Sequence, residues 1–126
     1  MTRTIYRFDD IAWHEPTGPG TDPKAAKAAA AVGVARKFLA QGDAGFFAQV
    51  VRFPPRFEAP AHSHDHAEVF VVLEGSCTFE SAPMTRHDST VVEANEKYGF
   101  TAGTEGLTFL VVRTGRAAFS AAGGAT

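Results

Sequence analysis

The sequence predicts an all-β protein, an antiparallel sandwich or barrel in a single domain, with a short helix near the N-terminus. Its length of 126 residues suits one compact domain. A hydrophobic fraction of 44% and 11 phenylalanines supply enough apolar material for a core. After Gly33 the chain divides into short segments rich in Val, Phe and Thr, with turn residues between them and no second helix. This spacing is typical of antiparallel β-sandwiches and barrels.

Residues 1–32 are expected to form an N-terminal arm that contains the short helix. Prolines and glycines between positions 16 and 20 interrupt regular structure. The segment Thr21-Asp22-Pro23 then starts a helix, because a capping side chain precedes a proline whose missing N–H is not needed there. We expect the helix to cover Lys24–Ala31 and to end at Gly33. Its side chains are mostly alanine, so it is either a short outer helix or a mobile arm.

Residues 33–115 are expected to form the barrel, and residues 116–126 a C-terminal tail. The tail consists largely of small residues and glycine, so we expect it to fray. Turns are predicted at Gly42-Asp43, Glu74-Gly75, Ala82-Pro83 and Gly103–Gly106. The predicted strands are Val34–Ala40, Gly45–Phe53, Glu68–Leu73, Ser76–Glu80, Ser89–Glu93, Tyr98–Ala102 and Leu107–Arg113.

The charge pattern and the single cysteine exclude several classes of protein. The formal net charge is -2 and the basic residues are scattered, so there is no clustered basic face for nucleic acid. Cys77 is the one cysteine, so an internal disulfide cannot form. The stretch Ala25–Val34 is shorter than the about 20 apolar residues that span a bilayer, and the first ten residues lack a signal-peptide pattern. We therefore expect a cytoplasmic protein that binds neither membrane nor nucleic acid.

Three of the five histidines fall between Pro60 and Glu68. A strand places alternate residues on one face, so His62 and His64 point the same way and Glu68 has the same parity. Two imidazoles and a carboxylate on one wall suit a divalent Fe, Mn, Ni, Co or Zn ion. The alternative is that these side chains are simply packed or exposed. That alternative is harder to sustain for a cluster, since each unpaired buried polar group costs about 1–3 kcal/mol.

The pattern His62-x-His64-x-x-x-Glu68, followed after six residues by Gly75, resembles the first conserved motif of the cupin family. The strand and turn at residues 68–75 are similar to those that follow this motif in small single-domain cupins. The resemblance covers roughly Val34–Arg113. It implies a jelly-roll, or double-stranded β-helix, barrel of six to eight strands with a metal inside. It also implies frequent homodimers and activities that range from dioxygenases, isomerases and lyases to non-catalytic sensors and storage proteins.

The second cupin motif is matched less well, at residues 87–100. Asp88 and Gly99-Phe100 keep its frame, but Tyr98 stands where the family has its fourth ligand, a histidine. The site could keep three ligands, like a two-His-one-carboxylate iron site. Tyr98 could itself ligate, or lie beside the metal and donate a proton to the substrate as a catalytic residue. Finally, His66 could serve as an additional ligand. We favour three ligands with Tyr98 beside them.

The same parity predicts the walls of a substrate pocket, although for most of these side chains a plain core position is the better expectation. Gln49 is the most informative of them, because a glutamine that points inward needs a hydrogen-bond partner or a substrate. Arg36 or Arg52 could anchor a carboxylate if either pointed inward, but outward positions are expected for both. The predicted pocket residues are Phe47, Gln49, Val51, Phe70, Phe79, Phe100 and Phe109.

Two functions remain open from the sequence. The first is a metal-dependent enzyme, either a dioxygenase-like oxidoreductase or a lyase, that acts on a small organic substrate. The second is a sensor or binding module whose metal is structural or lost, which the missing fourth histidine favours. By resemblance we expect a homodimer. Val69, Val71 and Leu73 lie on the strand face opposite the ligands, where they could pair with a second copy, pack against another sheet, or contact the helix.

Overall fold

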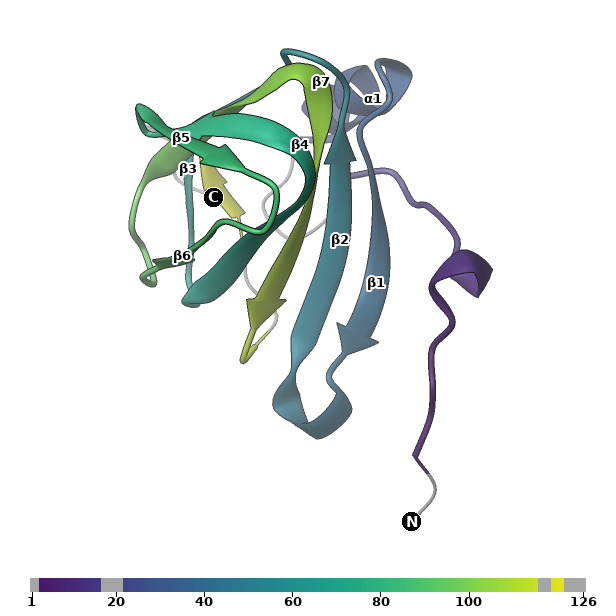
Figure 1. The fold of residues 1–126 in the computed structure, drawn as a ribbon. Helices are drawn as coiled ribbons and strands as arrows, with labels where there is room; N and C mark the ends of the chain where they lie inside the picture. The colour runs from purple at the N-terminus through teal and green to yellow at the C-terminus, as the bar shows by residue number, and fades with distance from the viewer. Residues whose placement is uncertain (1–2, 17–21, 116–118, 122–126) are drawn as a thin grey trace.

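The computed structural model describes residues 3–16, 22–115 and 119–121, and shows one antiparallel sheet curled into a barrel (Figure 1). A single turn of 3-10 helix, Phe8–Asp10, and the helix α1, Pro23–Ala31, precede the sheet, and a second 3-10 turn, Asp43–Gly45, joins its first two strands. The strands are β1 Ala35–Gln41, β2 Phe47–Phe53, β3 Glu58–His64, β4 Glu68–Phe79, β5 Ala82–Thr85, β6 Ser89–Val92, β7 Tyr98–Arg113 and β8 Phe119–Ala121. The predicted all-β antiparallel class with a short helix is confirmed.

The strand β7 organises the barrel because it pairs with three other strands. Its second half, Leu107–Arg113, lies between β2 on one side and β4 on the other. Its first half pairs with β3 and with the far end of β4. The strands β5 and β6 pair with β4 alone, and β1 pairs with β2 at the edge of the sheet. Through β7, the histidine-bearing strand β3 and the glutamate at the start of β4 belong to the same curved wall.

Two pairs of predicted strands are each one long, bent strand. The glycines at the predicted turns are instead bulges, where the register of β4 against β7 shifts on either side of Gly75. Gly75 has φ of 75°, and a side chain there would overlap the carbonyl oxygen of Gly106. Only glycine allows the two backbones to approach this closely while the strands bend. Glycine therefore indicated a change of direction correctly, but not the end of a strand.

Three further predictions of local structure are corrected. Ala82 and Pro83, expected in a turn, begin β5, which is an edge strand and so tolerates proline. The histidine segment forms its own strand, β3, which was absent from the predicted set. The tail, expected to fray, contributes β8, in which Ser120 pairs with Ser63. Residues 116–118 and 122–126 lie outside the described part of the chain.

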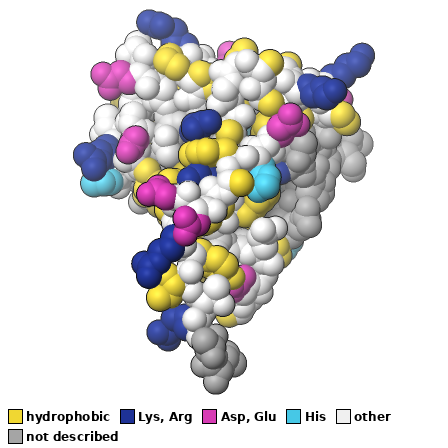
Figure 2. All heavy atoms as spheres, turned by 90° about the vertical axis from the view of Figure 1, so that its right-hand side faces the viewer, with side chains coloured by type: hydrophobic (Ala, Val, Ile, Leu, Met, Phe, Trp, Pro, Cys, Tyr) yellow, Lys and Arg dark blue, Asp and Glu magenta, His cyan; other side chains and the backbone are white. Residues whose placement is uncertain are grey.

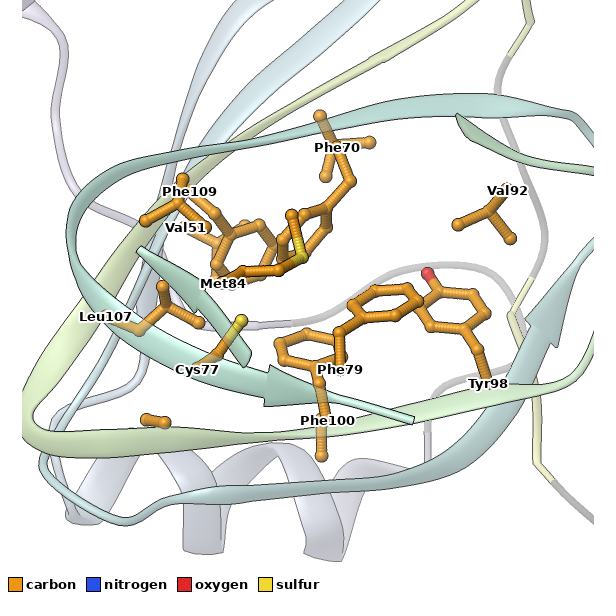
Figure 3. Packing of buried hydrophobic residues seen from close by; sticks show 14 residues of the cluster. Val51, Phe70, Cys77, Phe79, Met84, Val92, Tyr98, Phe100, Leu107 and Phe109 are labelled. Atoms are coloured by element: carbon orange, nitrogen blue, oxygen red, sulfur yellow. The ribbon is translucent and has the colours of Figure 1, made fainter. Parts of the chain in front are cut away.

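The barrel interior is filled by aromatic rings, and the buried ones come from β4 and β7 (Figure 3). Phe70 is fully buried, and its ring lies 4.7 Å from that of Phe109 and 5.2 Å from those of Phe79 and Phe100. Burial of each such side chain stabilises the fold by about 1.5–3 kcal/mol. The row of rings ends at Tyr98, which stacks on Phe79 at 5.2 Å. The apolar core therefore extends directly up to the candidate site.

The N-terminal arm covers the outer face of β1. Lys37 is only 5% exposed because its ammonium group donates a 2.8 Å hydrogen bond to the carbonyl of Phe8. The same ammonium lies 3.9 Å from the ring centroid of Phe8 and 4.9 Å from that of Trp13. Figure 2 shows this side of the molecule, where acidic, basic and hydrophobic side chains are interspersed. Within the described residues, no helix has both the length and the apolar character needed to cross a membrane.

Candidate metal and substrate site

The two predicted histidine ligands lie on β3 and the glutamate begins β4. Alternation along β3 places His62 and His64 on one side, with ring centroids 5.1 Å apart. Nε2 of His64 lies 3.9 Å from Oε1 of Glu68. His62 is 7% exposed, Glu68 is 3% exposed, and the side chain of His64 is 13% exposed. The structure thus brings the three predicted side chains together at one end of the barrel, largely out of water.

A backbone carbonyl determines which nitrogen of His62 can bind a ligand. Nδ1 lies 2.7 Å from the carbonyl oxygen of Pro60. A carbonyl only accepts hydrogen bonds, so Nδ1 carries the proton and Nε2 carries the lone pair in the neutral ring. Burial lowers the pKa of His62, which keeps the ring neutral near pH 7. Metal-binding histidines are commonly oriented by a hydrogen bond of this kind.

Glu68 is the centre of a small polar network. Its Oε1 accepts a 2.9 Å hydrogen bond from the hydroxyl of Tyr98 and a 3.2 Å bond from Nη2 of Arg113. Its Oε2 is buried, and within the described part of the chain it has no hydrogen-bond partner. A buried acceptor left without a partner is costly unless something binds it. Oε2 is therefore the open coordination point of this carboxylate.

Tyr98 lies beside the histidines, 2% exposed, with its ring centroid 4.4 Å from that of His62. It is directly opposite His62 in the pairing of β3 with β7. Burial raises the pKa of Tyr98, and the nearby charge of Glu68 raises it further. The phenol therefore keeps its proton at neutral pH and acts as a donor, not as a phenolate.

Arg113 was not among the candidate residues from the sequence. It is the last residue of β7 and lies opposite Glu68 in the β4–β7 ladder, with 12% of its side chain exposed. A sequence signal did exist, because Arg113 has the same parity as Leu107, Phe109 and Val111, which are buried. An arginine in phase with inward apolar residues indicates a buried partner of opposite charge.

The donor types fit a divalent metal, although the side chains are not arranged around a common point. Within residues 3–16, 22–115 and 119–121, no three His, Cys, Asp or Glu side chains form a ready cluster for a metal ion. Two neutral imidazoles and a carboxylate with one open oxygen are nevertheless a suitable set. Bonds of about 2.0–2.2 Å allow two ligands of one ion to be up to about 4 Å apart. Nε2 of His64 and Oε1 of Glu68, 3.9 Å apart, satisfy this limit, and the open Oε2 belongs to the same carboxylate.

His66 has other partners. Its Nδ1 lies 2.9 Å from Oδ1 of Asp65, and its ring lies so close to Gly115 that a side chain there would overlap it. More than a third of the side chain is exposed, at 37%. A role as an additional ligand stays a prediction, and it would require the ring to leave Asp65.

The predicted pocket residues divide into two groups. Gln49 and Phe47 are half-buried on β2, and Oε1 of Gln49 accepts a 3.4 Å hydrogen bond from Nη1 of Arg36. Arg36, expected to point outward, lies opposite Val51 and so faces the same side as that buried residue. The second group belongs to the packed core, namely Val51, Phe70, Phe79, Phe100 and Phe109.

Two clefts lie elsewhere, and neither is lined by His62, His64 or Glu68. One, of about 310 Å³, lies between β2, the bend of β4 and the bend of β7. The other, of about 340 Å³, lies along β5 and the start of β6, and Phe79 reaches it.

Cys77 is 4% exposed, and burial raises the pKa of its thiol to about 11, so it is not a nucleophile at neutral pH.

Comparison with solved structures shows the same fold in several differently named proteins. KdgF from Halomonas sp. is 18% identical, with a TM-score of 0.67 over 91% of this chain and 96% of that one. The polyketide cyclase RemF from Streptomyces resistomycificus is 20% identical, with a TM-score of 0.66 over 90% and 79%. A putative dioxygenase from Nostoc punctiforme is 17% identical, with a TM-score of 0.69 over 89% and 38%. At these identities the likeness concerns the fold alone.

The sequence comparisons are consistent with this fold. No curated protein matches the sequence. A family model described as a cupin domain matches residues 49–113, which include most of β2, the two histidines of β3, all of β4 and all of β7. This match covers more than half of the 126 residues. The chain belongs to the cupin family.

Proposed function

We propose that the protein binds one divalent metal ion through His62, His64 and Glu68 and acts on a small organic molecule. The reaction class is a dioxygenase-like oxidation or a lyase reaction. The observation that supports this most directly is the buried Oε2 of Glu68, which has no hydrogen-bond partner in the described chain and belongs to a carboxylate whose other oxygen lies 3.9 Å from Nε2 of His64. A bound Fe, Mn, Ni or Zn ion would supply Lewis-acid activation of a substrate oxygen, and iron would add redox chemistry.

The protein side chains have distinct roles in this proposal. Pro60 orients His62 through its carbonyl oxygen, so that Nε2 is the donor. Tyr98 holds a proton on its hydroxyl next to Glu68 and can donate a hydrogen bond or that proton to the substrate. The aromatic rings that adjoin Tyr98 keep water from this side of the site.

The metal is tested by elemental analysis of the purified protein after incubation with Fe, Mn, Ni and Zn in turn. About one ion per chain is expected for the wild type, and a loss of affinity of about tenfold or more for His62→Ala and His64→Ala. His87→Asn is the control, because His87 is an exposed turn residue. Absence of bound metal under all four conditions would overturn the proposal.

The reaction is tested separately, on protein that has been shown to hold metal. Protein loaded anaerobically with Fe(II) is mixed with enediols, diketones and phenols while oxygen is recorded, and products of bond cleavage are followed with Mn and Ni. Oxygen uptake or cleavage that needs Glu68 supports the enzyme. Flat traces throughout, from metal-loaded protein, would contradict the catalytic part alone.

A second candidate is a non-catalytic sensor or binding module for a small molecule. One observation favours it, namely that Tyr98 and Arg113 already donate hydrogen bonds to one oxygen of Glu68 and that Arg113 balances its charge. A site that is stable without metal suits a binding module whose metal has been lost. Folded protein that contains no metal, yet binds a small molecule reversibly at these residues, would decide for this candidate.

A further inference from the structure

Arg113 lies where the barrel interior meets solvent. On one side it is opposite Glu68 in the β4–β7 ladder, and on the other it is opposite Phe47 in the β2–β7 ladder. With 12% of the side chain exposed, the guanidinium is close to the surface but mostly covered. It is therefore placed to contact a molecule that enters beside Glu68.

Arg113 has donors that its contact with Glu68 does not use. A guanidinium has five N–H donors in a planar fork. Nη2 donates to Glu68 at 3.2 Å, whereas Nε is buried and has no hydrogen-bond partner in the described part of the chain. The Nε side of the fork matches the two oxygens of a carboxylate, which arginine can bind with two parallel hydrogen bonds.

The charges of the site favour an anion once a metal is present. Glu68 and Arg113 neutralise each other, and the hydroxyl of Tyr98 is uncharged. Histidines that bind a metal do so as neutral rings. With a divalent ion, the charges of the metal, Glu68 and Arg113 therefore sum to two positive charges in a largely buried site. Without Arg113 the same ligands would leave one. Such an excess is costly at low dielectric unless an anion accompanies it.

A second guanidinium reinforces the positive character of this face. Arg36 lies on the same side of the sheet as the buried Val51, and its side chain reaches along the sheet to Gln49. The strands β1 and β2 contain no acidic residue, and neither does the half of β7 that ends at Arg113. Glu68 is thus the one carboxylate that the inward positions of β1, β2, β4 and this half of β7 supply, among residues that the structure describes.

We infer that Arg113 makes the site selective for a small organic acid, whose carboxylate pairs with the guanidinium while its apolar part lies towards Phe47. This inference rests on the proposed function for its charge argument, because the metal supplies the excess charge that the acid compensates, whereas the unpartnered Nε of Arg113 is present with or without a metal. It extends that function by naming the substrate class, and it makes Arg113 the residue that determines specificity.

The test compares pyruvate with pyruvamide, which has nearly the same shape but no charge. Protein loaded with Co(II) is titrated with each compound while the visible absorption of the metal is recorded, after the metal content has been measured. For the wild type, pyruvate should bind about tenfold or more tightly than pyruvamide. Arg113→Gln should reduce this preference to about threefold or less, whereas Arg86→Gln, an exposed control of equal charge change, should keep it.

Arg113→Lys provides the variant for the case in which Arg113→Gln does not fold, since it keeps the positive charge but loses the fork. Its preference for pyruvate should lie between those of the wild type and Arg113→Gln.

Equal binding of the two compounds by Co(II)-loaded wild type would overturn the inference and leave the metal site intact. If no metal binds, the proposed function fails, and the same pair is then compared on metal-free protein by NMR. A preference for pyruvate that needs Arg113 would still support the inference, and no preference would overturn it.

Discussion

The hydroxyl of Tyr98 donates a 2.9 Å hydrogen bond to the buried carboxylate of Glu68, from a strand that begins 30 residues later in the chain. Tyr98 stands at the position of the histidine ligand of the second cupin motif, yet here it hydrogen-bonds to a ligand of the proposed metal. A protonated phenol and a guanidinium together stabilise a carboxylate that would otherwise be buried with its charge uncompensated. The network therefore supplies two hydrogen bonds and a counter-charge to a carboxylate at the end of a barrel filled with aromatic rings.

Tyr98→Phe should destabilise the fold by about 1–3 kcal/mol, because it removes a donor from a buried charged acceptor and leaves the packing of the ring nearly unchanged. The free energy of unfolding in urea measures this. Tyr6→Phe is the matched control, since Tyr6 also donates to a carboxylate, that of Asp43 at 2.7 Å, but on the exposed surface. The control should change stability by less than about 0.5 kcal/mol. Equal effects of the two substitutions would contradict the structural role of the Tyr98 hydroxyl.

Tyr98→His should raise the affinity for a divalent metal by about tenfold or more, because it adds a third imidazole opposite His62 on the neighbouring strand. Metal content and competition with a chelator measure the change. His66→Ala is the informative companion, because His66 contacts Asp65 and lies half-exposed. An unchanged affinity in His66→Ala is expected. A loss of metal there would instead place His66 among the ligands.

Gly75→Ala should destabilise the protein by more than about 2 kcal/mol, since a side chain at this bulge would overlap the carbonyl oxygen of Gly106. Gly33→Ala is the matched control. Gly33 also has a positive φ, 104°, but a side chain there would meet nothing within 4 Å. The control should cost only the backbone strain, about 1–2 kcal/mol. A thermal or urea unfolding series separates the two, and a smaller effect at Gly75 than at Gly33 would contradict the close approach of β4 and β7.

Strand parity predicted that His62 and His64 lie on one side, because both belong to β3 and alternation along a strand is local. Glu68 lies beyond the turn at residues 65–67, on β4, so its position near them follows from the fold of the barrel and not from parity. Arg113 could not be assigned a partner in this way. Its contact with Glu68 depends on the register of β7 against β4, which bulges at Gly75 shift by whole residues. The same reason explains why two long strands were predicted as four short ones.

Arg36 and Lys37 show a second limit of the sequence. Charged residues on an edge strand are usually solvated, so an outward position was expected for Arg36, and nothing in the sequence pointed to burial of Lys37. The structure buries Lys37 because the N-terminal arm runs beside β1 and supplies a carbonyl and two aromatic rings. Hydrogen bonds between the backbones of His14 and Arg36 hold the arm in place. A contact between an irregular segment and a strand leaves no periodic pattern that a sequence could display.

Cys77 should react slowly with a disulfide reagent such as DTNB, because burial raises the pKa of its thiol to about 11. At pH 8 the thiolate fraction should be on the order of a hundred times lower than in unfolded protein, where the pKa is about 8.5. The thiol binds its proton more tightly in the folded state, so this contribution to stability is complete below about pH 8.5 and is lost as the pH rises towards 11. Reaction rates in native buffer and in 6 M guanidinium test the first point. Urea unfolding of the wild type and Cys77→Ala between pH 8 and 10.5 tests the second, with a shallower decline expected for the variant. Rapid labelling of the native protein at pH 8, at the rate seen in guanidinium, would show that the interior opens beside Cys77 and would contradict the packed core around it.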